Sequence, residues 1–116
     1  MDIQELRREA QTMQPQLTAD RRRLHRNPEA GAVLPETVAY VKERLTEMGY
    51  HPQELGGGLT ATVTGTDTGR CILLRADMDA LRGQEQSGLS FRSENGCMHA
   101  CGHDMHTAML LGAAQL

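Results

Sequence analysis

The sequence has no long hydrophobic run and no strong excess of one charge. No apolar stretch approaches the roughly 20 residues that cross a bilayer, and residues 1–8 lack the apolar core of a secretory signal. The net charge is −3, and the basic run at residues 21–23 is typical of a solvated helix face rather than a nucleic-acid footprint. We therefore expect a cytoplasmic protein that binds neither membrane nor nucleic acid.

The sequence also has only three cysteines and no Cys-x-x-Cys pair. A disulfide framework is therefore not expected, and a redox or metal-sensing thiol protein is a weak hypothesis. Cys71 opens an apolar run, which predicts a buried structural thiol. Cys97 and Cys101 lie beside histidines, and a reducing compartment would leave both thiols free to bind a metal ion.

Hydrophobic periodicity predicts two helical segments at the start of the chain. Apolar residues recur at helical spacing over residues 3–17, with Pro15 as a candidate break. A second segment, capped by Thr18 or Asp20, is predicted to end just before Pro28, because the residue preceding a proline disfavours helix.

The rest of the pattern indicates an α/β fold. Residues 35–48 predict a helix that Gly49 stops. The alternation over residues 59–64 predicts a half-exposed strand, and the apolar run at residues 71–74 predicts a buried one. A last apolar helix is predicted from about Asp104 onward, and it reaches the end of the sequence without a stop signal.

Two carboxylates, Asp77 and Asp79, follow the predicted buried strand. Open α/β sheets place their ligand sites beyond the carboxyl ends of strands, so this position favours a functional role, with Arg75 neutralising part of the charge. Asp is also common at turns and caps, and for an isolated Asp-x-Asp that alternative is the stronger one. A metal-ligand cluster later in the chain shifts the balance toward a shared site.

That cluster is residues 97–106, which hold two thiols, three imidazoles and a carboxylate. The Cys/His alternation over residues 97–103 could suggest a structural zinc knuckle, but an extended chain advances about 3.3 Å per residue, so the four ligands would span about 20 Å. Gly102 lets the backbone turn, so Cys101 and His103 could both reach one ion. Asp104 is as plausible an N-cap as a metal-facing group, and His106 is as plausible a hydrogen-bonded residue as a ligand.

Four segments of the sequence resemble the amino-terminal motifs of the M20 metallopeptidases. They occur in the family's order and spacing, and the most similar branch is the amidohydrolases that cleave N-acyl amino acids, hippurate and indole-acetyl amino acid conjugates. The segments are residues 24–31, 73–81, 98–106 and 110–114.

This resemblance implies a metal-dependent amidohydrolase of small N-acyl amino acids that carries two divalent ions, such as zinc, manganese, cobalt or nickel. Cys101 and His103 would bind metal. The acidic motif of Asp77 and Asp79 would contribute the catalytic Asp that orients the metal network. Asp79 matches the position two after a metal-binding His of the wider family, and Asp77 stands where that His does, so both are candidate catalytic residues. A metal-activated water would attack the acyl carbonyl, with a Glu as general base. The family's catalytic domain has a central sheet flanked by helices, and the full-length protein is expected to be a homo-oligomer.

Two departures from the family pattern affect this interpretation. Arg82-Gly83 stands where the motif continues with a proline and an aliphatic residue. The family's Glu-Glu pair and two later histidines have no counterpart here. We therefore expect residues 1–116 to be the truncated amino-terminal part of the catalytic domain, inactive by itself, with the lid or dimerisation domain absent. The alternative is a non-catalytic metal-binding or scaffold fragment.

Overall fold

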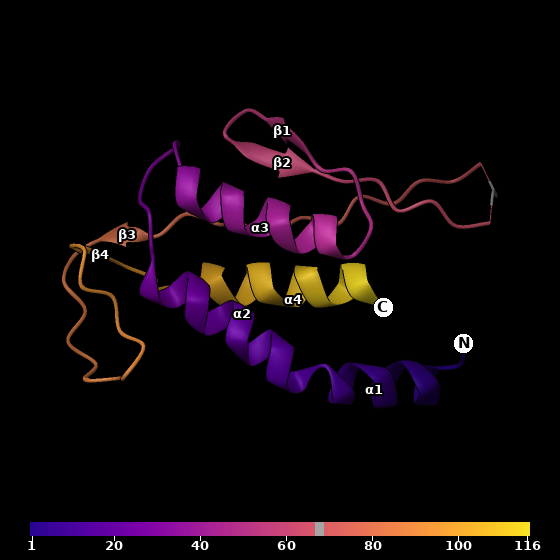
Figure 1. Cartoon of the computed structure of the whole chain (residues 1–116), viewed down its shortest axis with the longest axis horizontal. Coiled ribbons are helices and arrows are strands. Elements are labelled where there is room, and N and C mark those ends of the chain that lie inside the picture. Colours follow the sequence, from indigo (N-terminus) through magenta and orange to yellow (C-terminus); the bar gives the residue numbers. More distant parts are fainter. Residues whose placement is uncertain (67–68) are drawn as a thin grey trace.

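The computed structural model describes residues 1–66 and 69–116. The described chain combines helices with short strands, as the sequence predicted, and none of its helices has the length and apolar content needed to cross a membrane (Figure 1). The elements are α1 (Ile3–Thr12), α2 (Gln14–Arg26), α3 (Pro35–Glu47), β1 (Gln53–Leu55), β2 (Gly58–Thr60), β3 (Leu81–Arg82), β4 (Cys97–Met98) and α4 (His103–Gln115).

The first two helices are separated at Met13, which confirms the break near Pro15. Pro15 lies in the first turn of α2, where its missing N–H has no helical partner to lose. The prediction that Thr18 or Asp20 caps a helix is wrong, because both lie inside α2, which has already begun at Gln14. The helix ends at Arg26, ahead of Asn27 and Pro28, as predicted.

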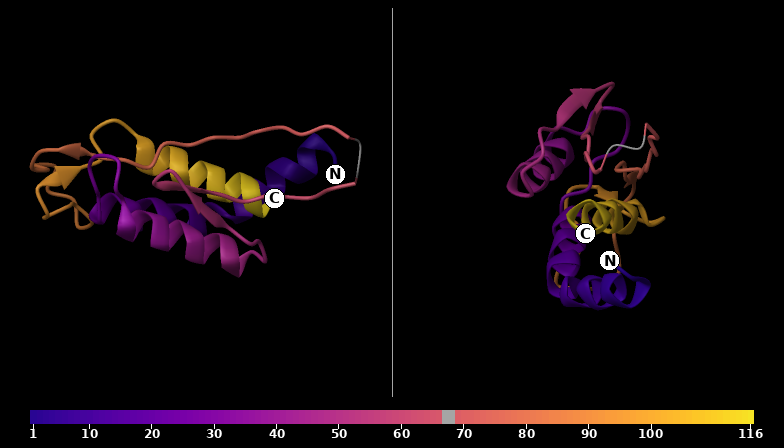
Figure 2. Two further views of the ribbon diagram at one scale, coloured as in Figure 1. Left: turned by 90° about the horizontal axis from the view of Figure 1, so that it is seen from above. Right: turned by 90° about the vertical axis from the view of Figure 1, so that its right-hand side faces the viewer.

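The hydrophobic core lies between α2, α3 and α4, which run side by side (Figure 2). Its fully buried members are Leu24 of α2, Val41 and Leu45 of α3 and Leu111 of α4. The helix predicted over residues 35–48 is confirmed, and its apolar stripe forms the α3 side of this core. These contacts fix α4, which carries the histidines considered below, against the two earlier helices.

A buried carboxylate adds a polar link between α2 and α3. Asp20 is 1% exposed, and its Oδ1 accepts hydrogen bonds from Tyr40 Oη at 2.6 Å, Arg44 Nε at 2.9 Å and Gln16 Nε2 at 3.1 Å. Burial and then the contact with Asp20 raise the pKa of Tyr40 well above its usual range. Tyr40 therefore stays a hydrogen-bond donor to Asp20 across the physiological pH range.

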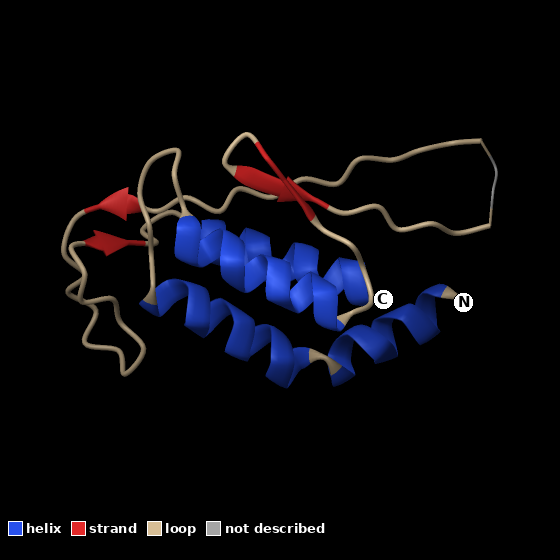
Figure 3. Ribbon diagram, turned by 45° about the horizontal axis from the view of Figure 1, so that its top comes forward, coloured by secondary structure: helices blue, strands red, loops and turns tan. Residues whose placement is uncertain are grey.

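The strands form two small antiparallel pairs at separate places beside the helices (Figure 3). In the first pair, β1 and β2 place Gln53 opposite Thr60 and Leu55 opposite Gly58. In the second, β3 and β4 place Leu81 opposite Met98. The strand predicted over residues 59–64 is therefore present only in part, as β2.

The predicted buried strand at residues 71–74 is wrong. This segment has no regular secondary structure, Ile72 and Leu73 are each 85% exposed, and the Cys71 thiol is exposed rather than buried. A strand needs hydrogen-bonding partners beside it, and no strand of residues 1–66 or 69–116 pairs with this segment. The chain instead passes along α4 as an extended coil toward β3 (Figure 2).

Candidate metal centre

The coil that carries the acidic pair is attached to the first turns of α4. Thr107 Oγ1 lies 2.9 Å from the backbone carbonyl of Asp77 and 2.9 Å from that of His103, so it can donate to either. Gly102 precedes α4 with φ of 151°, a conformation that side chains disfavour, and it lets the chain turn into the helix. Asp77 and the start of α4 are thereby held next to each other.

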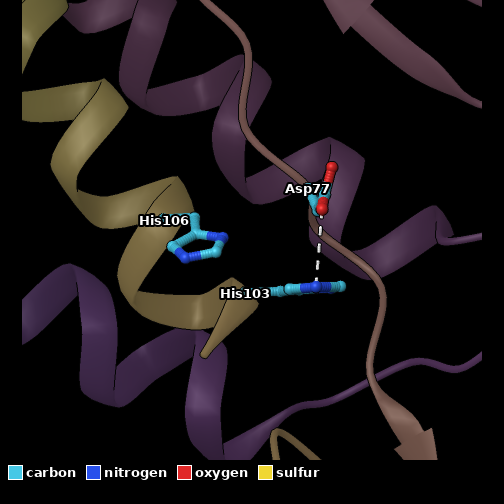
Figure 4. A group of neighbouring side chains, drawn as sticks. All are labelled: Asp77, His103 and His106. Carbon is cyan, nitrogen blue, oxygen red and sulfur yellow. Dashed lines mark ion pairs between the residues drawn. The ribbon is translucent and has the colours of Figure 1, made fainter. Parts of the chain in front are cut away.

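Asp77, His103 and His106 form one group of possible metal ligands (Figure 4). One ligand atom from each lies within 4.8 Å of the other two. His103 Nε2 is 3.4 Å from Asp77 Oδ2, and the two imidazole rings stack with their centroids 5.6 Å apart. The two histidines are three residues apart on α4, which puts their side chains on the same helix face.

Asp79 fixes the orientation of the His103 ring. His103 Nδ1 lies 2.8 Å from Asp79 Oδ1 and 2.9 Å from the Asp79 carbonyl oxygen. Because both partners are acceptors, Nδ1 carries the proton, and Nε2 is the nitrogen that faces Asp77. A histidine that donates one ring N–H to a carboxylate is the usual arrangement around a metal-binding imidazole.

The same neighbours favour a protonated His103 when no metal is bound. Partial burial lowers the pKa of His103, but the backbone and side chain of Asp79, together with the charge of Asp77, raise it overall. Arg75 opposes this charge, because its Nη2 lies 2.5 Å from Asp77 Oδ1. A metal ion at Nε2 would therefore have to displace a proton.

The donor set of this group fits a divalent metal ion. Two imidazoles and a carboxylate suit zinc, manganese, cobalt or nickel. Ligand atoms about 2.1 Å from one ion lie about 3 to 4 Å from one another, and the three ligand atoms found here lie within 4.8 Å of one another. His106, left open by the sequence, joins this group, and Asp77, His103 and Asp79 meet as expected for a shared site.

The remaining residues of the Cys/His alternation occupy different environments. Cys97 is half-buried in β4, and His99 is buried with neither ring nitrogen hydrogen-bonded within the described chain. Cys101 is exposed just before Gly102, and its thiol is outside the group formed by Asp77 and the two α4 histidines. Its assignment as a metal ligand remains a prediction.

Of the two roles left open for Asp104, the N-cap of α4 is wrong. The N-cap is Gly102, and Asp104 lies within the first turn with a side chain that is 1% exposed. Its Oδ2 lies 2.8 Å from Arg21 Nε and 2.7 Å from His25 Nδ1, so it ties α4 to α2. Sequence reasoning missed this contact, because no local pattern connects residues so far apart in the chain.

Glu85 lies on the other side of His25. Its Oε1 is 2.9 Å from His25 Nε2, and it accepts a hydrogen bond of 3.0 Å from the Ser93 backbone N–H. Burial raises the pKa of Glu85, but hydrogen bonds from Ser87 Oγ and Ser93, together with His25, lower it to about 2. Glu85 is therefore a carboxylate at neutral pH.

This shift predicts an acid-sensitive contribution to stability. A depressed pKa in the folded state stabilises the fold above the unfolded value of 4.5, and that contribution is lost as the pH falls toward about 2. Glu85→Gln should remove of the order of 2 kcal/mol at neutral pH, and its difference from the unsubstituted chain should shrink as the pH falls through that range. Urea unfolding across pH measures this difference.

The control for this experiment is Glu94→Gln, because Glu94 is 74% exposed and forms only a surface ion pair with Arg92. If the difference in unfolding free energy between the Glu85→Gln and unsubstituted chains stayed constant with pH, the lowered pKa assigned to Glu85 would be contradicted.

Comparison with known proteins identifies relatives of this chain in one family. Residues 73–116 match the model of peptidase family M20/M25/M40. A dinuclear metal-binding peptidase of the M20 family from Bacillus subtilis superposes with a TM-score of 0.84 and 37% identity, over 90% of this chain and 30% of that chain. This chain belongs to the M20 family. The match also confirms the predicted fold class, as a partial catalytic domain of that family.

Two curated relatives of this M20 chain are amide-cleaving enzymes by name. It is 47% identical over 108 residues to N-acetyl-L-cysteine deacetylase from Bacillus subtilis (strain 168), covering 90% of this chain and 26% of the relative. It is 40% identical over 121 residues to N-acyl-L-amino acid amidohydrolase from Geobacillus stearothermophilus, covering 100% and 32% respectively. The M20 chain thus spans about a third or less of the length of these relatives.

Proposed function

We propose that this chain carries part of the active site of a metal-dependent hydrolase that cleaves the amide bond of N-acyl amino acids. The observation that carries the proposal is the meeting of Asp77 with His103 and His106, with Asp79 bonded to the far side of the His103 ring. The names of the amidohydrolase and deacetylase relatives support the amide substrate.

In this proposal Cys101 and His103 are metal ligands, and Asp77 and Asp79 are catalytic residues. Asp79 accepts a hydrogen bond from the Nδ1–H of His103 and so directs Nε2 toward the metal position. Asp77 adds negative charge beside that nitrogen and faces His106 across the same space. A bound divalent ion would polarise the acyl carbonyl and activate a water molecule.

Several wider features belong to the same proposal. Residues 1–116 form the amino-terminal part of the catalytic domain. The full-length enzyme binds two divalent metal ions, which are zinc, manganese, cobalt or nickel. The relative described as dinuclear supports the count. The protein acts in the cytoplasm as a homo-oligomer on a small-molecule substrate, and the free thiols of Cys97 and Cys101 support a reducing compartment.

The test is hydrolysis of a panel of N-acetyl amino acids by the native gene product that contains this chain. Turnover should disappear when the metal is chelated and return when a divalent ion is added. Asp79→Asn should lower kcat/KM by about 10- to 100-fold, because it weakens the acceptor that orients His103. Glu94→Gln, a surface control, should leave turnover unchanged. Metal-independent hydrolysis, or full activity in Asp79→Asn, would contradict the proposal.

A further inference from the structure

Glu29, which lies between α2 and α3, contacts both the start of α3 and the segment that carries Asp79. Its carboxylate accepts two backbone hydrogen bonds, one of 2.6 Å from the N–H of Thr37 to Oε1 and one of 3.2 Å from the N–H of Glu36 to Oε2. Its backbone carbonyl accepts a third, of 2.7 Å, from the N–H of Ala80. Glu29 therefore holds these two segments next to each other.

The side chain of Glu29 supplies the cap that α3 lacks. The N-cap residue is Leu34, whose side chain cannot accept a hydrogen bond, and the first helical residue is Pro35, which has no N–H. The next two N–H groups, those of Glu36 and Thr37, are the ones that donate to Glu29. Because each carboxylate oxygen takes one of these N–H groups, the side chain is held at two points.

The backbone on either side of Glu29 is held as well. Pro28 is fully buried, and its carbonyl accepts a hydrogen bond of 2.9 Å from Asn95 Nδ2. Ala30 forms a parallel β-bridge with Ala80. The carbonyl of Glu29 is therefore fixed in place beside the backbone N–H of Ala80.

The peptide bond that Glu29 contacts also contacts His103. Its N–H belongs to Ala80 and donates to Glu29, whereas its C=O belongs to Asp79 and lies 2.9 Å from His103 Nδ1. The peptide unit is planar and trans, so these two groups point in opposite directions and rotate together. A hydrogen bond that fixes the N–H therefore also fixes the carbonyl that faces the His103 ring.

We propose that Glu29 is a positioning residue for His103 and acts through the Asp79–Ala80 peptide bond. The cap on α3 fixes Glu29, and Glu29 fixes the peptide bond. The carbonyl and carboxylate of Asp79 then orient the ring, so that Nε2 of His103 faces Asp77. The role of Glu29 at the metal rests on the proposed function, whereas the hydrogen-bonded connection from α3 to His103 does not.

The connection is tested by amide hydrogen exchange in the metal-free native gene product that contains this chain. The Ala80 amide should exchange slowly in the unsubstituted protein, and a freely exchanging Ala80 amide would overturn the proposal without any variant. Glu29→Gln replaces one acceptor oxygen by an NH₂ group, so the Ala80 amide should exchange about 10-fold faster. The amide of Leu24, in the core of α2, should keep its rate. Unchanged exchange at Ala80, or equal acceleration at Leu24, would overturn the proposal.

The role at the metal is tested by Co²⁺ titration of the same protein. Glu29→Gln should lower the Co²⁺ affinity by about 10-fold, which is the smaller end of the loss typical of groups that support a ligand, and the NMR signal of the His103 Nδ1–H should shift. The matched control is Glu36→Gln. It makes the same chemical change on an exposed side chain but leaves the backbone N–H that donates to Glu29, so neither measurement should change.

Unchanged Co²⁺ affinity in Glu29→Gln, with the His103 signal in its original place, would overturn the positioning role. If the unsubstituted protein bound no Co²⁺ at all, the positioning role would fall together with the proposed metal function, and the exchange of Ala80 would still decide whether the connection exists. If that protein does bind Co²⁺, failure of the Glu29 tests concerns this inference alone.

Discussion

Asp104→Asn should destabilise the chain by about 3–5 kcal/mol, because it removes one partner of a buried charge cluster and leaves the others uncompensated. Arg21 and His25 both direct N–H groups at Asp104 Oδ2, and an asparagine there offers at best one neutral acceptor. A small domain has only about 5–15 kcal/mol of stability in total, so the loss would be a large part of it. Urea unfolding followed by circular dichroism measures the change.

The matched control for Asp104→Asn is Glu54→Gln. Glu54 also forms an ion pair, with Lys42 at 3.2 Å, but its side chain is 62% exposed. Its substitution should change stability by less than about 1 kcal/mol. Equal effects of the two substitutions would show that the Asp104 cluster contributes no more than a surface pair.

His103→Ala should weaken binding of a divalent ion by more than about 100-fold, beyond the loss expected for a supporting residue. It removes the nitrogen that faces Asp77 and leaves His106 as the remaining imidazole of the group. Isothermal titration with Zn²⁺ or Co²⁺ measures the affinity. His51→Ala, an exposed histidine outside the group, is the control. If His103→Ala kept the metal affinity of the unsubstituted chain, the ion would have to bind at a site that does not include His103.

The helices were largely predictable because their signals are local. Helical spacing of apolar residues, a proline in the first turn and a glycine after the last turn identified α3, and the residue preceding Pro28 marked the end of α2. Each signal acts within a few residues of the structure it determines. The cap expected at Asp104 failed because a contact with α2 takes its side chain away from that role.

The strand predicted at residues 71–74 is absent, which shows that apolar composition alone does not determine a strand. Such a run shows that a segment would be stable if buried, but pairing depends on other segments lying beside it. No strand of the described residues pairs with this segment, and Leu73 is exposed. Asp77 still lies beside α4, because its backbone carbonyl is within hydrogen-bonding distance of Thr107 Oγ1. This contact does not require a strand.

The site was predictable in part. The dense ligand chemistry of residues 97–106 identified the first turn of α4, and the Asp77/Asp79 pair was correctly expected to meet it. The His25 cluster was missed, because 79 residues separate His25 from Asp104 and neither residue stands in a pattern that indicates the other. Long-range polar contacts of this kind depend on how the helices pack.

The central claim, that Cys101 and His103 bind a metal ion together, is tested most directly by the absorption spectrum of the cobalt-loaded chain. A thiolate-to-cobalt charge-transfer band should be present, should disappear in Cys101→Ser and should survive in Cys97→Ser, because Cys97 lies in β4 outside the Cys101–Gly102–His103 turn. The opposite result, a band lost in Cys97→Ser and kept in Cys101→Ser, would contradict the account.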